Sequence, residues 1–555
     1  MKSERYKKQE PFMLKDRTWP NNTIQKAPIW CSVDLRDGNQ ALPVPMDVEK
    51  KLKMFNLLKG IGFKEIEVAF PSASNTDFNF VRKIIEDNYL EDDTIIQVLT
   101  QSREHLIRRT FESIEGAKDA IVHLYNSTSE QQRRIVFKKD KPEIIRIAIE
   151  GTKLIKQLSE SCDTDIGFEY SPESFTGTEM DFALEICEAV MEVYQPTPQK
   201  KAIINLPATV EMTTPNVYAD QIEWFCRNIS CRDSVIISIH THNDRGTGVA
   251  ASELAMLAGA DRVEGTLFGN GERTGNLDII NVALNLYSQG IDPELDIYDI
   301  NSIIDIYEEC TDMRVHERHP YAGQLVFTAF SGSHQDAINK GLKYLKEKKP
   351  KCWDVPYLAI DPTDIGREYE AIIRINSQSG KGGVAFIMEN EFGYHLPKAM
   401  QPEFGSIIKQ RSDESGKELS ANEIMDAFTH NYLNVKGPYK LSEYHVESRS
   451  GKVNVSTQIL RNDELFELSG EGNGPISAFF DALKSTSAAK YCFEAYFEHA
   501  LSSGADAEAV AYIQLANGGR KSVFGVGQDR NTTTASFEAI ICALNRAVME
   551  NKNVE

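Results

Sequence analysis

Short apolar runs alternate with amphipathic segments along the first half of the chain. The segments between the runs repeat their apolar positions every three to four residues, as helices do; examples are 47–60, 75–88, 102–116, 141–160, 180–194, 216–228 and 244–259. The apolar runs have the length and composition of buried strands, and they cover 28–34, 64–70, 94–100, 119–125, 165–170, 201–206, 234–240 and 261–267. This alternation predicts an α/β fold, a (β/α)8 TIM barrel over residues 28–325. A doubly wound parallel sheet would produce a similar pattern.

Polar residues follow nearly every predicted strand at its carboxyl end. In a barrel these ends converge around one mouth, where the active sites of this architecture lie. In an open sheet only the ends near the switch point can meet. The polar strand ends favour the barrel; they include Asp34, Arg36, Asp37, Ser72, Thr100, Asn126, Glu169, Ser171, Asn205, Thr209 and the segment 269–273.

Two histidines, His240 and His242, end the seventh predicted strand two positions apart. Side chains alternate across a strand, so both imidazoles point the same way. Spacing alone leaves a divalent metal site and a pair of hydrogen-bonded histidines about equally open. Once a barrel closes, the first, seventh and eighth strands are neighbours, so Asp37 and Asn276 can join the pair. Such a mixed nitrogen and oxygen site suits Mg²⁺, Mn²⁺ or Zn²⁺. It leaves coordination positions on the metal free for the carboxylate and carbonyl of an α-keto acid.

Beyond residue 433 the pattern changes to strands followed by one helix, and it does so twice. The helix predicted over 475–484 and the helix predicted over 534–549 each follow two apolar runs and a glycine-containing turn. This repeat predicts a C-terminal α+β regulatory domain over 433–555 with an internal ββα-type duplication, whose centre suits a small ligand. Residues 326–432 form a mostly helical linker region, and 1–27 form an N-terminal lead-in.

Composition narrows the classes of function. A net charge of −21 argues against a general nucleic-acid surface, which needs clustered Lys and Arg. No apolar run is long enough to span a bilayer, so we expect no membrane insertion. The N-terminus is charged and has no apolar core of a signal peptide, which favours a cytoplasmic location. The 9 cysteines are scattered without a C-x-x-C pair and are expected to be reduced thiols.

Five segments, in order, resemble the signatures of the α-isopropylmalate synthases, within a wider group of metal-dependent condensing enzymes and lyases. They are 34–40 (DLRDGNQ), 171–173 (SPE), 205–211 (NLPATVE), 240–244 (HTHND) and 265–276 (GTLFGNGERTGN), and the resemblance spans nearly the whole chain. It implies condensation of acetyl-CoA with 3-methyl-2-oxobutanoate (2-oxoisovalerate), and thioester hydrolysis to (2S)-2-isopropylmalate and CoA. This reaction is the first committed step of leucine biosynthesis.

The resemblance also implies roles for individual residues. Asp37, His240, His242 and Asn276 would hold the metal, with Mg²⁺ expected before Mn²⁺ or Zn²⁺ and with K⁺ as an activating cation. Arg36 would stabilise negative charge on the keto oxygen, although a salt bridge to a neighbouring Asp is an alternative. The proposed proton-transfer residues are Glu173, His334 and Tyr357; their alternatives are a residue near a helix N-terminus, an ordinary hydrogen-bonded histidine and a surface aromatic.

Substrate and effector contacts follow from the same resemblance. His123 and Thr209 would contact the keto-acid carboxylate or the thioester, and Leu99, Ser171 and Asn205 would shape the pocket for an isopropyl group. Leucine would bind the C-terminal domain as a feedback inhibitor, and the chain would form a homodimer. The predicted effector contacts are Gly472, Gly474, Tyr496, Ala500 and Ala507, for which hairpin glycines and core alanines are the alternative.

Two other interpretations stay open. A sister condensing enzyme, which makes citramalate or homocitrate, or a related metal-dependent lyase would share the same motifs. A ligand-sensing regulator whose barrel has lost turnover would require a missing catalytic residue, whereas every motif position named above is filled.

Overall fold

The computed structural model describes residues 12–90, 93–329, 331–369, 381–415, 419–449, 451–502, 504, 507–516 and 522–552. The chain divides into two compact units. The first comprises Met1–Phe327 and Ile360–Glu368, and the second comprises Thr328–Ala359 and Tyr369–Glu555. The four-part division predicted from the sequence stays a prediction. Within the described residues, no helix is both long enough and apolar enough to cross a membrane.

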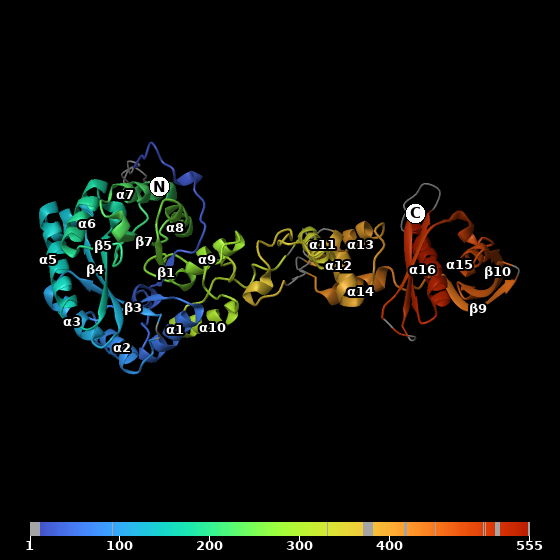
Figure 1. The fold of residues 1–555 in the computed structure, drawn as a ribbon. Helices are drawn as coiled ribbons and strands as arrows, with labels where there is room; N and C mark the ends of the chain where they lie inside the picture. The colour runs from blue at the N-terminus through green and yellow to red at the C-terminus, as the bar shows by residue number, and fades with distance from the viewer. Residues whose placement is uncertain are drawn as a thin grey trace. The chain divides into compact units, whose positions relative to one another are not determined.

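The first unit contains a closed parallel barrel of eight strands in sequential order (Figure 1). Pairing of the first strand with the eighth closes it. The barrel predicted from the sequence is therefore confirmed, with strand ends shifted by a few residues. The strands are β1 (Ile29–Ser32), β2 (Glu65–Ala69), β3 (Ile95–Gln101), β4 (Asp119–Ser127), β5 (Asp165–Glu173), β6 (Ala202–Ala208), β7 (Val235–Thr241) and β8 (Arg262–Gly265).

Helices follow the strands and cover the outside of the barrel (Figure 1). Side chains that accept hydrogen bonds from backbone N–H groups fix where several of them begin, as Asp47 does for α1, Ser74 for α2 and Asp140 for α5. The first of these helices ends at Gly62, whose φ of 108° suits glycine. The helices are α1 (Val48–Ile61), α2 (Asn75–Glu86), α3 (Glu104–Ile114), α5 (Lys141–Ser159), α6 (Met180–Tyr194), α7 (Pro215–Asn228), α8 (Gly248–Leu257), α9 (Ile279–Ser288) and α10 (Ile300–Thr311).

The second unit begins with helices and ends with two strand-and-helix repeats. Its strands form two antiparallel sheets, of order β11-β10-β9 and β12-β13-β14. The helices that precede the repeats are α11 (Gly332–Lys348), α12 (Lys381–Phe392), α13 (Gln401–Ser415) and α14 (Ala421–Asn431). The first repeat comprises β9 (Tyr439–Arg449), β10 (Lys452–Arg461), β11 (Glu464–Gly472) and α15 (Pro475–Leu483). The second comprises β12 (Cys492–Ala500), β13 (Ala509–Ala516), β14 (Val523–Asp529) and α16 (Thr532–Lys552).

The predicted duplication is present, and each repeat has one strand more than the sequence analysis predicted. The missed strands are β9 and β12, so the repeat unit is βββα rather than ββα. Both strands are mostly exposed or half-buried, and charged residues interrupt their apolar positions. A strand with little buried apolar surface gives a weak periodic signal, which explains why both were missed.

Close packing between a strand and a helix recurs in both repeats. A Cβ atom on Gly470 of β11 would lie 2.3 Å from the carbonyl oxygen of Ala478 in α15. A Cβ on Gly525 of β14 would lie 2.2 Å from the amide nitrogen of Ala543 in α16. The two repeats share one hydrophobic core, where Phe479 and Phe537 stack with ring centroids 4.0 Å apart. Glycine is therefore required where each last strand meets its helix.

Replacing Gly525 with alanine is expected to destabilise the second unit by about 1–3 kcal/mol, because the helix must move away from the sheet. The measurement is thermal unfolding of the full chain followed by circular dichroism. Gly474→Ala is the matched control, since a Cβ there would meet nothing within 4 Å. Equal transition temperatures for Gly525→Ala and the wild type would contradict the packing argument.

Candidate active site

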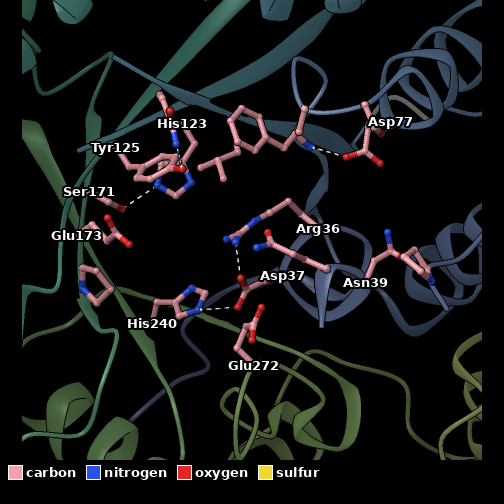
Figure 2. A pocket seen from close by; sticks show the side chains of 18 of the residues that line it. Arg36, Asp37, Asn39, Asp77, His123, Tyr125, Ser171, Glu173, His240 and Glu272 are labelled. Atoms are coloured by element: carbon pink, nitrogen blue, oxygen red, sulfur yellow. Dashed lines mark hydrogen bonds and ion pairs between the residues drawn. The ribbon is translucent and has the colours of Figure 1, made fainter. Parts of the chain in front are cut away.

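A cavity of about 1050 Å³ opens at the carboxyl ends of the barrel strands. Figure 2 shows Arg36, Asp37 and His240 close together in it, with His123 and Ser171 across the cavity. The lining residues come from the segments after β1 and β2, from β3 to β7 or the residues just after them, and from the loop after β8. They include Arg36, Asp37, Asn39, Phe70, Asp77, Leu99, His123, Tyr125, Ser171, Glu173, Asn205, Thr209, His240, His242, Glu272 and Arg273.

The predicted metal ligands converge at this cavity. Asp37 lies in the turn Asp34–Gly38 that follows β1, His240 lies in β7, and His242 follows β7. One potential ligand atom from each of the three lies within 4.8 Å of the others. His240 Nε2 is 3.5 Å from Asp37 Oδ2 and 3.0 Å from Asn276 Oδ1. The four residues predicted from the sequence to form one site therefore do lie side by side at the mouth of the barrel.

The loop after β8 supplies Asn276 through tight backbone contacts. Asn276 forms an isolated antiparallel bridge with His242, and its amide donates to the carbonyl of Gly269 at 3.1 Å. Gly275 has a φ of 104°, and a Cβ on it would lie 2.0 Å from the carbonyl oxygen of Gly269. A Cβ on Gly271 would lie 2.3 Å from Asn276 Nδ2. The glycines of this loop thus allow Asn276 to approach the histidines.

The donor set fits a divalent cation. It offers two imidazole nitrogens, a carboxylate and an amide oxygen, a combination that suits Mg²⁺, Mn²⁺ or Zn²⁺. Two of its buried atoms, Asp37 Oδ2 and His242 Nδ1, have no hydrogen-bond partner among the described residues. Unsatisfied buried polar atoms are costly, and a cation bound between these residues would satisfy them.

Electrostatics within the cluster favour binding of a positive charge. Burial raises the pKa of Asp37, but the Arg36 guanidinium and His240 outweigh it and hold that pKa well below its usual range. Burial opposes protonation of His240, yet the nearby carboxylates of Asp37 and Glu264 raise its pKa to about 10. Burial and the charge on His240 lower the pKa of His242 to about 4. A cation can therefore take the place of the proton between His240 Nε2 and Asp37.

Arg36 is held by two carboxylates at the edge of the cavity. Its Nε lies 2.5 Å from Glu67 Oε2, and its Nη1 contacts Asp37 Oδ1. The salt bridge to a neighbouring Asp is therefore present, and Arg36 also lines the cavity. Both interpretations of this residue fit the same geometry.

His123 belongs to a polar network on the opposite wall. Its Nδ1 is 2.8 Å from Glu67 Oε1, and its Nε2 is 2.7 Å from Ser171 Oγ. Asn205 Nδ2 donates to the same Ser171 oxygen at 3.0 Å. Ser171 and Asn205 therefore bond to each other, and Leu99 supplies an apolar surface beside them.

Glu173 ends β5 and faces the cavity, where Ser127 Oγ donates to its carboxylate. It ends the strand directly before Ser174, the residue that precedes the short 3-10 helix Phe175–Gly177, so its alternative position near a helix N-terminus is also present. Thr209 lines the cavity, and its Oγ1 accepts from the amide of Ser174 at 2.9 Å. Both positions match predicted sites at the barrel mouth.

His334 and Tyr357 belong to the second unit. Their rings stack with centroids 4.1 Å apart, and Tyr357 is exposed. Both residues were predicted to contribute to the site from outside the barrel, and the structure places them in contact with each other.

The predicted effector residues lie in both repeats. A Cβ on Gly472 would lie 2.5 Å from the amide nitrogen of Ala478, so this glycine has a packing role. Tyr496 and Ala500 lie on β12, and Tyr496 donates to Glu498 on the same strand. Ala507 lies in the connection from β12 to β13.

Sequence reasoning missed a set of charged residues inside the barrel. Two pairs spaced i and i+2 carried the signal, Glu65 with Glu67 and Arg262 with Glu264, because alternation puts each pair on one face of its strand. The same argument had been applied only to the histidines. The missed, fully buried charged members are Glu67, Arg262 and Glu264; Glu169, already named as a polar strand end, and the neutral Gln97 are buried beside them.

A histidine beyond α10 fastens the end of the barrel to the loop after β8. His319 Nε2 lies 2.6 Å from Asp278 Oδ2, and both side chains are largely buried. Asp278 also begins α9 by accepting from the amide of Asn281. Burial lowers the pKa of His319, but Asp278 outweighs it and raises the pKa above 6.5.

Family models match along the chain. A model described as HMGL-like matches residues 27–306, one for the alpha-isopropylmalate synthase post-catalytic domain matches 324–389, and one for the LeuA allosteric (dimerisation) domain matches 418–548. Together with the barrel and its cluster of candidate metal ligands, they define an HMGL-like barrel enzyme with an allosteric domain.

Curated relatives narrow this class. The chain is 59% identical to a 2-isopropylmalate synthase of Clostridium acetobutylicum, over 98% of this chain and 99% of that protein. It is 54% identical to one from Pseudomonas savastanoi (99% and 98%) and 53% identical to one from Rhodospirillum rubrum (98% and 98%). The chain belongs to the 2-isopropylmalate synthase family.

The His319–Asp278 pair predicts a pH dependence of barrel stability. Because folding raises the pKa of His319, the pair stabilises fully below pH 6.5, and this contribution is lost as pH rises through the folded pKa. His319→Gln should lower the free energy of unfolding by about 1 kcal/mol at pH 6 and by less at pH 9. Thermal unfolding at both pH values measures this, with His105→Gln on the exposed face of α3 as control. An equal loss at both pH values would exclude the ion pair as its cause.

Proposed function

We propose that this chain condenses acetyl-CoA with 3-methyl-2-oxobutanoate and water to give (2S)-2-isopropylmalate and CoA, the first committed step of leucine biosynthesis. The observation that carries the proposal is the convergence of Asp37, His240, His242 and Asn276 at the mouth of an HMGL-like barrel. Identity of 59% to a 2-isopropylmalate synthase over nearly the full length supports the choice of reaction.

These four residues would hold a divalent cation, with Mg²⁺ as the first candidate, Mn²⁺ or Zn²⁺ as alternatives and K⁺ as an activator. The oxygens of Asp37 and Asn276 suit Mg²⁺, whereas the imidazoles suit all transition-metal alternatives. When bound, the cation supplies Lewis-acid polarisation of the keto carbonyl. The other roles belong to side chains.

Arg36 would stabilise the negative charge that develops on the keto oxygen as the new carbon–carbon bond forms. Its guanidinium is fixed by Glu67 and Asp37, so the charge is oriented before the substrate arrives. Thr209 and His123 would orient the keto acid by hydrogen bonds. Leu99, Ser171 and Asn205 would form the wall that faces its isopropyl group.

Glu173 would accept the proton from the methyl carbon of acetyl-CoA, with His334 and Tyr357 as further proposed catalytic residues. The carbanion attacks the keto carbon, the resulting alkoxide takes up a proton, and water then cleaves the thioester to release CoA. A carboxylate is a weak base for this carbon acid in water, so exclusion of water from the cavity is part of the proposal.

The C-terminal domain would bind leucine and inhibit the barrel, and it would join two chains in a homodimer. The match to an allosteric (dimerisation) domain over 418–548 supports both statements. The proposed leucine contacts are Gly472, Gly474, Tyr496, Ala500 and Ala507.

CoA release from acetyl-CoA should be fastest with 3-methyl-2-oxobutanoate among a panel of keto acids, and leucine should slow it. A thiol-capture assay with glyoxylate, pyruvate, 2-oxoglutarate and 3-methyl-2-oxobutanoate measures this preference. An apolar slot discriminates by about 1–3 kcal/mol per methylene, so we expect preferences of 10-fold or more. Faster turnover with pyruvate, glyoxylate or 2-oxoglutarate would favour a sister condensing enzyme.

His242→Ala should reduce metal-dependent turnover by more than about 100-fold, because the cation loses one imidazole ligand. Circular dichroism should show the barrel folded, since His242 follows β7 and is not part of the apolar core. His105→Ala on α3 serves as the control. Near-normal turnover by His242→Ala would remove this residue from the ligand set.

A further inference from the structure

Glu264 lies on β8 inside the barrel, and its side chain is fully buried. One of its oxygens, Oε2, accepts from His240 Nδ1 at 2.8 Å and from Asn205 Nδ2 at 3.2 Å. Its other oxygen, Oε1, accepts from Arg262 Nη1 at 2.5 Å. The carboxylate of Glu264 therefore contacts the proposed metal ligand His240, the cavity-wall residue Asn205 and the buried guanidinium of Arg262.

The bond to His240 decides which ring nitrogen carries the proton. An ionised carboxylate can only accept, so Nδ1 must donate, and Nε2 is the nitrogen left to bind a cation in place of its proton. That Nε2 faces Asp37 Oδ2 at 3.5 Å and Asn276 Oδ1 at 3.0 Å. His240 is thus held in the tautomer and ring orientation that ligation through Nε2 requires.

The bond to Asn205 decides the orientation of its amide group. The carboxylate of Glu264 can only accept a hydrogen bond, so Asn205 must turn its Nδ2 group toward Glu264 Oε2. The same Nδ2 group donates to Ser171 Oγ. Ser171 in turn bonds to His123 at 2.7 Å. The carboxylate on β8 therefore orders the wall of the cavity as well as the metal ligand.

Arg262 fixes the carboxylate in place. Its Nη1 also donates to Ser238 Oγ at 2.9 Å, its Nη2 donates to Gln97 Oε1 at 2.8 Å, and its Nε contacts Glu65 Oε2 at 2.5 Å. These partners lie on β7, β3 and β2, so the guanidinium is tied to three strands besides its own. A planar guanidinium held by these bonds leaves Glu264 little freedom to turn.

We propose that Glu264 is a positioning residue that sets the tautomer of His240 and the amide orientation of Asn205, and so couples metal affinity to keto-acid binding. The expected effect on keto-acid binding rests on the proposed function, whereas the expected effect on metal affinity does not. Ligand-supporting carboxylates of this kind change metal affinity by about 10–100-fold when they are removed.

Glu264→Gln is the principal test. With its carbonyl turned to Arg262, the new amide presents an NH₂ group to His240 Nδ1 and to Asn205, which selects the wrong tautomer and opposes the Asn205 donor. We expect the dissociation constant of Mn²⁺, measured by electron paramagnetic resonance on the metal-stripped full chain, to rise about 10–100-fold. The KM for 3-methyl-2-oxobutanoate should rise as well, and excess Mn²⁺ should restore part of the turnover.

Glu65→Gln is the matched control, because it removes another of the carboxylates that pair with Arg262. Among the described residues, Glu65 contacts Arg262 but neither His240 nor Asn205. Its Mn²⁺ affinity should stay within about threefold of the wild type. Glu264→Asp keeps the acceptor at a shorter reach, so its affinity should fall between those of the wild type and Glu264→Gln.

Circular dichroism establishes that each variant is folded. If Glu264→Gln does not fold, Glu264→Asp takes its place as the test. The proposal then predicts that Glu264→Asp binds Mn²⁺ more weakly than Glu65→Gln does. Affinity equal to that of Glu65→Gln, in whichever Glu264 variant folds, would overturn the proposal. Weakened Mn²⁺ binding in a chain that releases no CoA with any keto acid would uphold the positioning role and reject the proposed reaction.

Discussion

The parallel pairing of β1 with β8 runs from Ile29 opposite Arg262 to Ser32 opposite Gly265, and it decides which strand ends can meet. Asp37 follows β1, Asn276 follows β8, and β8 pairs on its other edge with β7, which carries His240. Asp37 and Asn276 are more than 200 positions apart in the sequence, yet closure of the barrel brings both next to His240. In an open sheet, β1 and β8 would lie at different places and no common site would form.

This dependence on closure explains what could be predicted from the sequence. The strands, most helices and the four ligand side chains follow from apolar periodicity, from alternation within a strand and from the neighbour rule for barrels. The interior charges were missed because Arg262 and Glu264 sit in a short run read only for its apolar residues. Strand β9 was missed because its exposed face is charged. Which oxygen meets which nitrogen depends on side-chain packing, which periodicity does not encode.

The charges inside the barrel form a connected set rather than isolated ions. Arg262 contacts Glu65 and Glu264, and Arg36 contacts Glu67 and Asp37. Taking ions out of water costs several kcal/mol each, so such a set is weak evidence for stability. Apolar side chains would fill the same space at lower cost. The charges are better explained by the site that they support. Asp37 is itself a proposed metal ligand, Glu264 contacts the proposed ligand His240, and Glu67 contacts His123 in the cavity wall. Of these carboxylates, only Glu65 has no such contact among the described residues.

The turn that carries Asp37 is supported from behind by a buried lysine. Lys51 on α1 donates to the carbonyls of Leu35 at 3.1 Å and Val68 at 3.4 Å, and it pairs with Asp77 at 2.6 Å. Its ammonium thus joins the end of β1 to the end of β2, next to Arg36 and Asp37. With Lys51 behind the first ligand and Glu264 behind His240, both sides of the cluster are held by charged groups that do not face the cavity centre. Ligands fixed in this way need little rearrangement when a cation binds, because the folding of the barrel has already ordered them.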